Sequence, residues 1–366
     1  MTFAKYSLIQ LSGVLLLFTA GSCHKDEPCA TCPPQPKDPR TFTWVRDTLA
    51  DGSYQSGPSG IWGSAPNDVY VTSWGSSLFI GKLWRYDGKK WNDLTPIYVE
   101  AFPRQQIFQF ACEDVFGFGK NDVWVVGGRD TSVVWQQLIQ GYVMHYDGAK
   151  WTGMVVPEAR ELLAVWGASS TDLWAGGYAG SMFHYEGNAW QRYVLDDSLL
   201  VIQIRGTGGT DIYATGWSLS SAGLLHIRYY HWNGSSWSLV ESRFDNDPGV
   251  GFGPRCEISG GTLYSLFGST VTRRVSPGVW QQVLSDPTET FWNVSVSTTG
   301  DVYAQGGSFG EVLYHYNGKD WYRFPQFTNS NIALGFVWSN GEETFVTGKE
   351  LNGVNGWPRS FVLHGK

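Results

Sequence analysis

Histidine is the first residue type in this sequence whose spacing could indicate chemistry. Four of the seven histidines, His145, His184, His231 and His315, each begin a copy of the segment HYDG, HYEG, HWNG or HYNG. A metal site needs ligands that converge from different positions, whereas equivalent positions of a repeat do not meet in a wide ring. We therefore expect these histidines to pack between repeat units, and we predict no metal and no cofactor.

Acidic residues are the second set that could do chemistry. Asp245-Asn246-Asp247 resembles the acidic pair that holds a metal in nucleotide-sugar transferases, but those enzymes need a parallel sheet with helices, which this sequence lacks. Two interpretations of this segment remain: a solvated loop, or a loop that contacts a calcium ion. Glu113 and Asp114 are neighbours on a predicted strand and point to opposite faces, which suits paired acid–base work poorly. No nucleophile has a recognisable base, so we predict no catalytic residue.

The N-terminus has the pattern of an export signal. Lys5 is followed by an apolar run over residues 8–19, which is short for a membrane span, and small residues lead into Cys23. This pattern resembles the lipobox of bacterial lipoproteins. It predicts a signal peptide at residues 1–22 and a lipid, palmitate among its acyl chains, on Cys23. An ordinary secretory signal that is cut nearby is the alternative.

The residues after Cys23 predict where the protein is held. The segment HKDE that follows it resembles the signal that sends lipoproteins of one Gram-negative phylum to the cell surface. Residues 23–40 form a polar, proline-rich tether. We therefore expect a lipid anchor in the outer membrane and a domain exposed at the cell surface. The formal net charge of −7 comes without a basic stripe, so nucleic acid is a poor partner.

Four cysteines besides Cys23 remain to be placed. Cys29 and Cys32 would lie in an oxidising compartment, where they can form a disulfide with a small loop. A redox role would need a thioredoxin-like βαβ unit, which is absent. Cys112 and Cys256 begin inner strands on nearly opposite sides of the predicted ring, whereas a disulfide needs Cα atoms within about 7 Å. We expect these two to be free thiols.

An internal repeat organises the rest of the chain. The clearest copy runs from Leu162 to Tyr193, and parts of it recur as IWGSAPNDVYVTSW, DVFGFGKNDVWVVGG, VMHYDGAKW and LYHYNGKDW. An apolar and aromatic pair opens the second strand of seven units, and in the last unit it is degenerate, Thr344-Phe345. A tryptophan opens the last strand of six units: Trp91, Trp151, Trp190, Trp237, Trp280 and Trp321.

The seventh tryptophan of this set lies at the other end of the chain. Residues 41–48 look like a last strand without its preceding three, and Trp44 restores the count. We predict an all-β fold, a seven-bladed β-propeller over residues 41–366. Its N-terminal strand completes the last blade, so the ring leaves no open sheet edge.

The repeat resembles a known group of proteins. The pattern W-G-x4-D-V-W followed by H-Y-D-G-x-x-W is similar to the tryptophan-rich β-propeller repeats of bacterial lipoproteins, over essentially the whole predicted domain. The outer hairpin is distantly similar to the Asp-box of sialidase-like propellers. The serine and threonine of that box are missing, so sialidase chemistry is not implied. The resemblance implies a fold, and a fold alone does not imply a function.

We expect the ligand-binding site on the variable loops of one face. The residue that leaves the second strand at this face is Trp74, Arg129, Tyr178, Trp217, Ser308 or Lys349 in the six blades that can be aligned. Aromatic rings and cations around a shallow mouth suit stacking on sugar rings and contacts to hydroxyl or acidic groups. Secondary candidates are Trp135, Phe309 and Trp357. Ordinary packing of the loops is the alternative interpretation.

These observations favour a binding protein over an enzyme. The first hypothesis is a surface lipoprotein that binds a glycan or a protein through its variable face. The second is an interaction scaffold within an envelope complex, and the third is a glycan-active enzyme with catalytic residues of an unrecognised kind. Acidic side chains that converge in a central pocket would favour the enzyme. An open aromatic platform would favour binding of a glycan, and a flat apolar patch would favour a protein partner.

Overall fold

The computed structural model describes residues 37–49, 57–73, 81–94, 110–130, 139–245, 255–276, 278–307, 310–328, 331–352 and 359–366. The predicted signal peptide, Cys23, Cys29 and Cys32 lie outside these ranges. In the described part of the chain, no helix is both long enough and apolar enough to cross a membrane.

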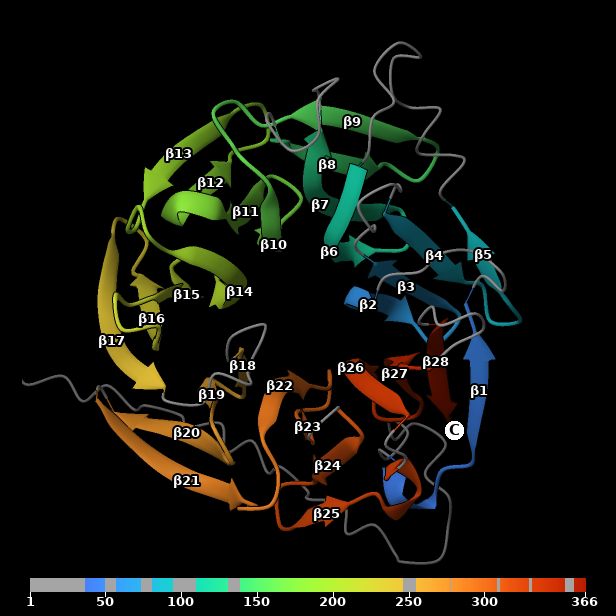
Figure 1. Cartoon of the computed structure of the whole chain (residues 1–366). Helices are drawn as coiled ribbons and strands as arrows, with labels where there is room; N and C mark the ends of the chain where they lie inside the picture. Colours follow the sequence, from blue (N-terminus) through green and yellow to red (C-terminus); the bar gives the residue numbers. More distant parts are fainter. Residues whose placement is uncertain are drawn as a thin grey trace, which may run out of the picture. The chain divides into compact units, whose positions relative to one another are not determined.

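The described residues form seven four-stranded antiparallel sheets arranged as a ring (Figure 1). We number the blades in chain order. Blade 1 contains β2 (Pro58–Ala65), β3 (Asp68–Ser73), β4 (Lys82–Tyr86) and β5 (Trp91–Asp93). Blade 2 contains β6 (Phe110–Gly119), β7 (Asp122–Asp130), β8 (Ile139–Tyr146) and β9 (Trp151–Val155). Blade 3 contains β10 (Leu162–Ser169), β11 (Asp172–Gly177), β12 (Ser181–Tyr185) and β13 (Trp190–Val194). The first strand named in each blade is the innermost (Figure 1).

The other four blades follow the same plan, and only the last one differs in the origin of its outer strand. Blade 4 contains β14 (Leu200–Gly208), β15 (Asp211–Leu219), β16 (Leu225–Trp232) and β17 (Trp237–Asp245). Blade 5 contains β18 (Cys256–Ser259), β19 (Thr262–Phe267), β20 (Thr270–Ser276) and β21 (Val279–Ser285). Blade 6 contains β22 (Phe291–Val296), β23 (Val302–Gly306), β24 (Val312–Tyr316) and β25 (Trp321–Arg323). Blade 7 contains β26 (Ile332–Ser339), β27 (Thr344–Glu350) and β28 (Arg359–Gly365), and its outer strand is β1 (Trp44–Thr48).

The N-terminal strand closes the ring, as predicted. In blade 7, β1 pairs with β28, and Trp44 lies opposite Gly365. The backbones of Thr43 and Lys366 exchange two further hydrogen bonds, at 3.1 and 3.2 Å. The Trp44 ring packs edge-on against Phe324 and Phe327 of the neighbouring blade, at centroid distances of 5.7 and 5.1 Å. The seven-bladed propeller and its closure by the N-terminal strand are therefore confirmed.

The Trp-Gly pair of the repeat is explained by packing between blades. Trp62 of blade 1 covers Gly117 of blade 2, and a Cβ at Gly117 would lie 2.7 Å from the indole ring. Trp166 of blade 3 covers Gly206 of blade 4 in the same way, at 2.6 Å. A side chain at either glycine would force the two blades apart, because protein cores have no spare volume at such contacts.

The recurrent histidines bond within their own blades, whereas the sequence analysis expected packing between blades. His184 Nε2 lies 2.7 Å from Asp172 Oδ1, and its ring stacks on Trp174 at 4.1 Å. The same acid–histidine hydrogen bond occurs in three other blades: Asp122 with His145, Asp211 with His231, and Glu343 with His364. In blade 6, His315 lies farther from Asp301, at 3.6 Å, which is beyond hydrogen-bond distance. In blade 1, Arg85 takes this place opposite Asp68. Each pair ties the first turn of a blade to its third strand.

Polar side chains on the inner strands link neighbouring blades around the axis. Asp114 Oδ2 on β6 accepts a hydrogen bond from the Val165 amide on β10, at 3.1 Å. Gln203 Oε1 on β14 accepts one from the Cys256 amide on β18, at 2.6 Å. Cys112 and Cys256 are both buried and do not form a disulfide, as predicted.

Candidate functional site

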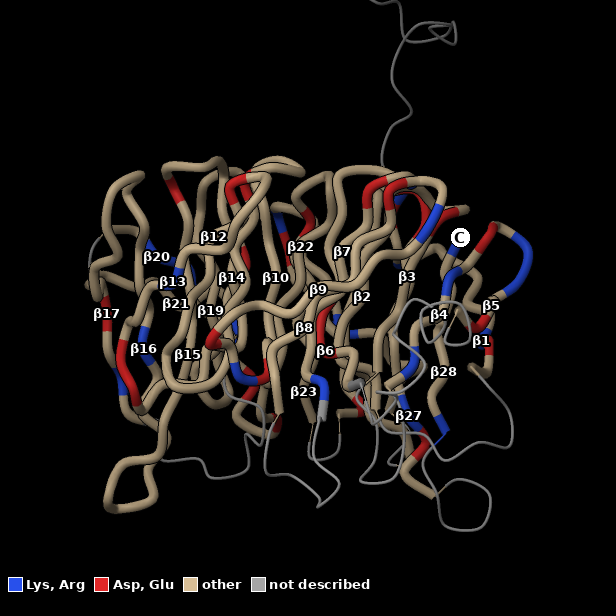
Figure 2. The backbone as a smooth tube through the Cα atoms, turned by 90° about the horizontal axis from the view of Figure 1, so that it is seen from above, with Lys and Arg blue, Asp and Glu red and all other residues tan. Residues whose placement is uncertain are grey.

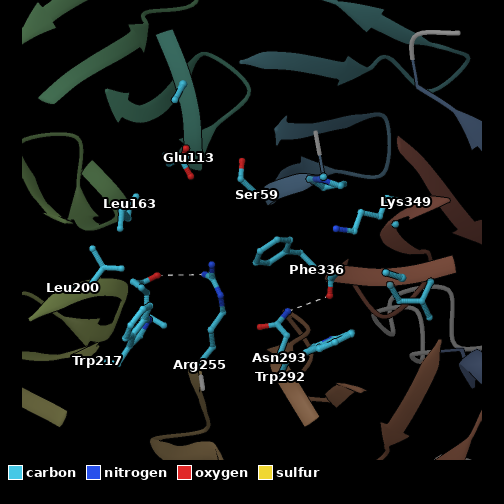
Figure 3. Close-up of a pocket in the computed structure, with 18 of the residues that line it drawn as sticks. Ser59, Glu113, Leu163, Leu200, Trp217, Arg255, Trp292, Asn293, Phe336 and Lys349 are labelled. Carbon is cyan, nitrogen blue, oxygen red and sulfur yellow. Dashed lines mark hydrogen bonds between the residues drawn. The ribbon is translucent and has the colours of Figure 1, made fainter. Parts of the chain in front are cut away.

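A cavity of about 790 Å³ lies inside the ring, where the inner strands begin and the second strands end (Figure 3). We call this end of the ring the loop face, and the opposite end, which carries the tight hairpins, the turn face. Both ends are visible when the ring is seen from the side (Figure 2). The volume lies within the range of about 300–1,000 Å³ that is common for small-ligand sites.

Three of the residues that the sequence analysis proposed for ligand binding line this cavity. They are Tyr178, which directly follows β11, Trp217 near the end of β15, and Lys349 near the end of β27. Tyr178 keeps 37% of its surface exposed. Trp217 also packs on the apolar cluster formed by β16, β18 and β19, so it belongs to the core and to the cavity wall.

Arg129 does not line the cavity. Like Trp217 and Lys349, Arg129 is still paired within its sheet, but its side chain is held against β8. Its guanidinium donates a hydrogen bond to Gln140 at 3.1 Å and lies 5.3 Å from the centre of the Tyr142 ring. Only 9% of Arg129 is exposed. Trp74, Ser308, Trp135, Phe309 and Trp357 lie outside the described residues.

The cavity also contains charged and aromatic residues that the sequence analysis did not select. Glu113 lines it, whereas its neighbour Asp114 points away and bonds the Val115 and Val165 amides. The expected alternation of the two faces therefore holds, but the acid that accompanies Glu113 is Glu161 of the next blade. Four further cavity residues were missed: Arg255, Trp292, Asn293 and Phe336.

Glu113 and Glu161 form an acidic wall, which comes from blades 2 and 3. The pKa of Glu113 is raised to about 8, mostly by burial and in part by the charge of Glu161, while Arg255 opposes the change. Burial also raises the pKa of Glu161. Among the described residues, neither carboxylate has a hydrogen-bond or ion-pair partner. Beside them, burial raises the pKa of the Tyr178 hydroxyl, and both carboxylates add to the shift.

Arg255 and Lys349 form a basic wall, which comes from blades 5 and 7. Arg255 Nη1 donates to the Ile202 carbonyl at 3.3 Å, and its guanidinium lies 4.7 Å from the centre of the Phe336 ring. Its side chain extends from the side of the cavity that faces Glu113 (Figure 3). Burial lowers the pKa of Lys349, for which the described residues supply no anionic partner.

The comparisons with known proteins concern the fold. The sequence matches no known protein family and no curated protein. A solved structure of YCF48 bound to D1 peptide superposes with a TM-score of 0.59 over 93% of this chain and 98% of that one, at 14% identity. YCF48 from Cyanidioschyzon merolae superposes with a TM-score of 0.56 over 87% and 98% of the two chains, at 16% identity. This chain shares their fold.

His226 and Ser242 have the residue types of a catalytic pair but not its hydrogen bonding. Ser242 Oγ lies 2.5 Å from His226 Nε2, but Arg228 donates to His226 Nδ1 at 2.8 Å. Because a guanidinium can only donate, Nδ1 is the acceptor and Nε2 carries the proton, so His226 cannot remove the serine proton. In the described part of the chain, no three His, Cys, Asp or Glu side chains lie close enough together to hold a metal ion.

Proposed function

We propose that this protein is a binding protein that receives a glycan or a segment of another protein in the cavity at its loop face. One observation carries this proposal: Tyr178, Trp217 and Lys349 line the same cavity of about 790 Å³. The three residues come from three different blades, where each lies near or directly after the end of a second strand. Rings and a cation at the mouth of a rigid scaffold are a common arrangement for ligand recognition.

A protein segment is the better supported of the two ligands. The cavity wall contains both acidic and basic side chains, and peptides contain groups of both signs. A propeller of the same fold, YCF48, has been solved with a peptide bound. The rings of Tyr178, Trp217 and Trp292 support a glycan, because sugars stack on aromatic faces.

The place of action is proposed from the sequence. The lipobox-like segment before Cys23 and the proline-rich tether of residues 23–40 support a domain held at the outer membrane by lipid alone. In that arrangement the anchor fixes the protein to the membrane, while the loop face remains free to meet a ligand at the cell surface.

Peptide and glycan arrays test this proposal with the full chain purified in detergent. We expect binding to one class of ligand, and we expect Tyr178→Ala and Lys349→Ala to weaken it. Phe244→Ala is the control, because Phe244 is exposed on β17 and does not line the cavity. Binding that is unaffected by both cavity substitutions, or absent from both arrays, would contradict the proposal.

A glycan-active enzyme is the second candidate, and the acidic wall favours it. With a pKa of about 8, Glu113 is protonated at neutral pH and could donate its proton to a glycosidic oxygen, while the Glu161 carboxylate accepts a proton from the attacking water. Release of reducing sugar from defined oligosaccharides, lost in Glu113→Gln, would support this candidate. Binding without any product release would exclude it.

A further inference from the structure

We propose that the cavity selects a dipolar ligand, a short peptide with a free ammonium group and a free carboxylate, and holds these groups at opposite walls. The ammonium group would lie at Glu113 and Glu161, and the carboxylate at Arg255 and Lys349. This inference rests on the proposed function, since it names the kind of ligand that the same cavity takes.

The first support is the order of the charges around the ring. The acids come from blades 2 and 3, and the cations come from blades 5 and 7. Because the blades follow one another around a closed ring, the two signs of charge are separated to different sides of the cavity. Figure 3 shows Glu113 on one side and Arg255 on the side that faces it, with Lys349 on a neighbouring part of the wall.

The second support is that other charged groups near the axis already have partners. Arg205 Nε donates to Glu257 Oε1 at 2.7 Å, and Gln203 donates to the same oxygen at 2.8 Å. The Asp114 carboxylate accepts from two backbone amides. Arg160, which belongs to the same side as the acids, lies over the Tyr178 ring at 5.4 Å.

The four wall residues differ from these groups, because none of them has a direct ion pair among the described residues. Glu113 is protonated at neutral pH, and an ammonium group beside it would favour release of this proton. A charge that is removed from water and left unpaired is costly. A ligand that brings an ammonium group to the acids and a carboxylate to the cations would relieve this cost at both walls. A ligand with one charge would relieve it at one wall only.

The surface between the walls suits the middle of a peptide. Leu163, Leu200 and Ile202 line this part of the cavity, and Trp217 adds a ring. Apolar side chains can receive a short aliphatic spacer but offer no hydrogen bonds to sugar hydroxyls. A polyanion such as nucleic acid would meet the acidic wall, and a neutral sugar would leave both walls unmatched.

The test uses alanine peptides of two, three and four residues, so that the separation of the walls selects the length. Each peptide is prepared with free ends, with an acetylated amine, with an amidated carboxylate and with both ends blocked. Titration calorimetry on the full chain in detergent at neutral pH gives the affinities. We expect the free form of one length to bind most tightly, and each single block to weaken binding at least about tenfold, the effect of losing one charged hydrogen bond.

Two substitutions assign the ends of the ligand. Glu161→Gln should remove the preference for a free amine and keep the preference for a free carboxylate, and Lys349→Met should do the reverse. Glu186→Gln and Lys89→Met are matched controls, because both residues are exposed in hairpins of the turn face. Thermal unfolding of each variant checks that the fold is intact.

The outcomes separate this inference from the proposed function. Equal binding of free and blocked peptides, weakened by Tyr178→Ala, would overturn the dipolar ligand and keep the cavity as the binding site. Binding of chitotriose without binding of any peptide would have the same meaning. If no peptide of any length binds, the dipolar ligand is wrong, and the arrays decide whether the cavity binds something else.

Discussion

The guanidinium of Arg255 lies 4.7 Å from the centre of the Phe336 ring, which joins a residue at the start of blade 5 to a strand of blade 7. Blade 6 lies between them in the ring, so the contact is made inside the cavity. A cation held over an aromatic face by about 0.5–2 kcal/mol has a restricted position. Arg255 is therefore in place before a ligand arrives, which reduces the ordering that binding requires.

Stability should depend on pH through Glu113. Its pKa is about 8 in the folded protein against 4.5 for the free residue, so between these values the folded state holds a proton that the unfolded chain has lost. The free energy of unfolding should therefore fall as pH rises from about 4.5 to about 8, by at most about 1.4 kcal/mol per pH unit. Urea titrations across this range should show a smaller fall for Glu113→Gln. Parallel curves for the two proteins would contradict the buried, protonated state.

Removal of the N-terminal strand should open the ring. Deleting residues 41–48 removes β1 and withdraws Trp44 from its contacts with Phe324 and Phe327. The lost tryptophan packing alone should lower the free energy of unfolding by about 3–5 kcal/mol. The matched control deletes residues 24–36 and retains Asp38 and Arg40, which bond each other beside β1. Thermal unfolding should separate the two deletions, and equal melting temperatures would count against a structural role of β1.

Core and cavity aromatics should respond differently to truncation. Trp174 is fully buried and stacks on His184, so Trp174→Ala should destabilise the fold by about 3–5 kcal/mol. Tyr178 is partly exposed at the cavity, and Tyr178→Ala should change stability by less than about 1 kcal/mol while it weakens ligand binding. Chemical unfolding measures the first effect, and array binding the second. Similar destabilisation by both would make Tyr178 a packing residue.

The two described cysteines should be inert in the folded protein. Both are fully buried, and burial raises the pKa of the Cys256 thiol to about 12, with Thr215 as its hydrogen-bond partner. Because thiolate is the reactive form, neither should react with a maleimide at neutral pH. Mass spectrometry should detect both adducts only after denaturation. Rapid labelling of the native protein would show that the inner strands open.

Lipidation tests the proposed anchor. Cys23→Ser should abolish incorporation of a fatty-acid analogue and release the protein from membranes, because the lipid is the proposed attachment. Metabolic labelling and fractionation measure both effects. Cys29→Ser is the control, since Cys29 lies beyond the proposed lipidated residue and should leave labelling unchanged. Undiminished labelling of the first variant would refute the lipoprotein proposal.

The fold could be predicted because its signals repeat. A tryptophan that follows a hairpin glycine lies at the start of the last strand of six units, and a Trp-Gly pair recurs in two first strands, at Trp62 and Trp166, where blades pack. Trp44 could be assigned to the ring because one copy of this pattern was missing at the C-terminal end. Packing rules of this kind act locally and leave a periodic pattern.

The cavity could be predicted only in part, because a ligand site breaks the repeat. Tyr178, Trp217 and Lys349 were found through their common position after or at the end of a second strand. Arg129 occupies the corresponding position, but its guanidinium contacts Gln140 and Tyr142 and does not line the cavity. Glu113 and Glu161 come from different blades and become neighbours only when the ring closes, so no spacing in the sequence indicates the pair.

The pairing of β1 with β28 also has a consequence for biosynthesis. The ribosome makes β1 before any other strand of the ring and its partner β28 last, so β1 must wait unpaired while all the intervening blades are synthesised. An unpaired strand is a template for aggregation and a target for proteases. A chain that stops early would keep this exposed strand permanently, so truncated copies would be recognisable to quality-control proteases from their first strand.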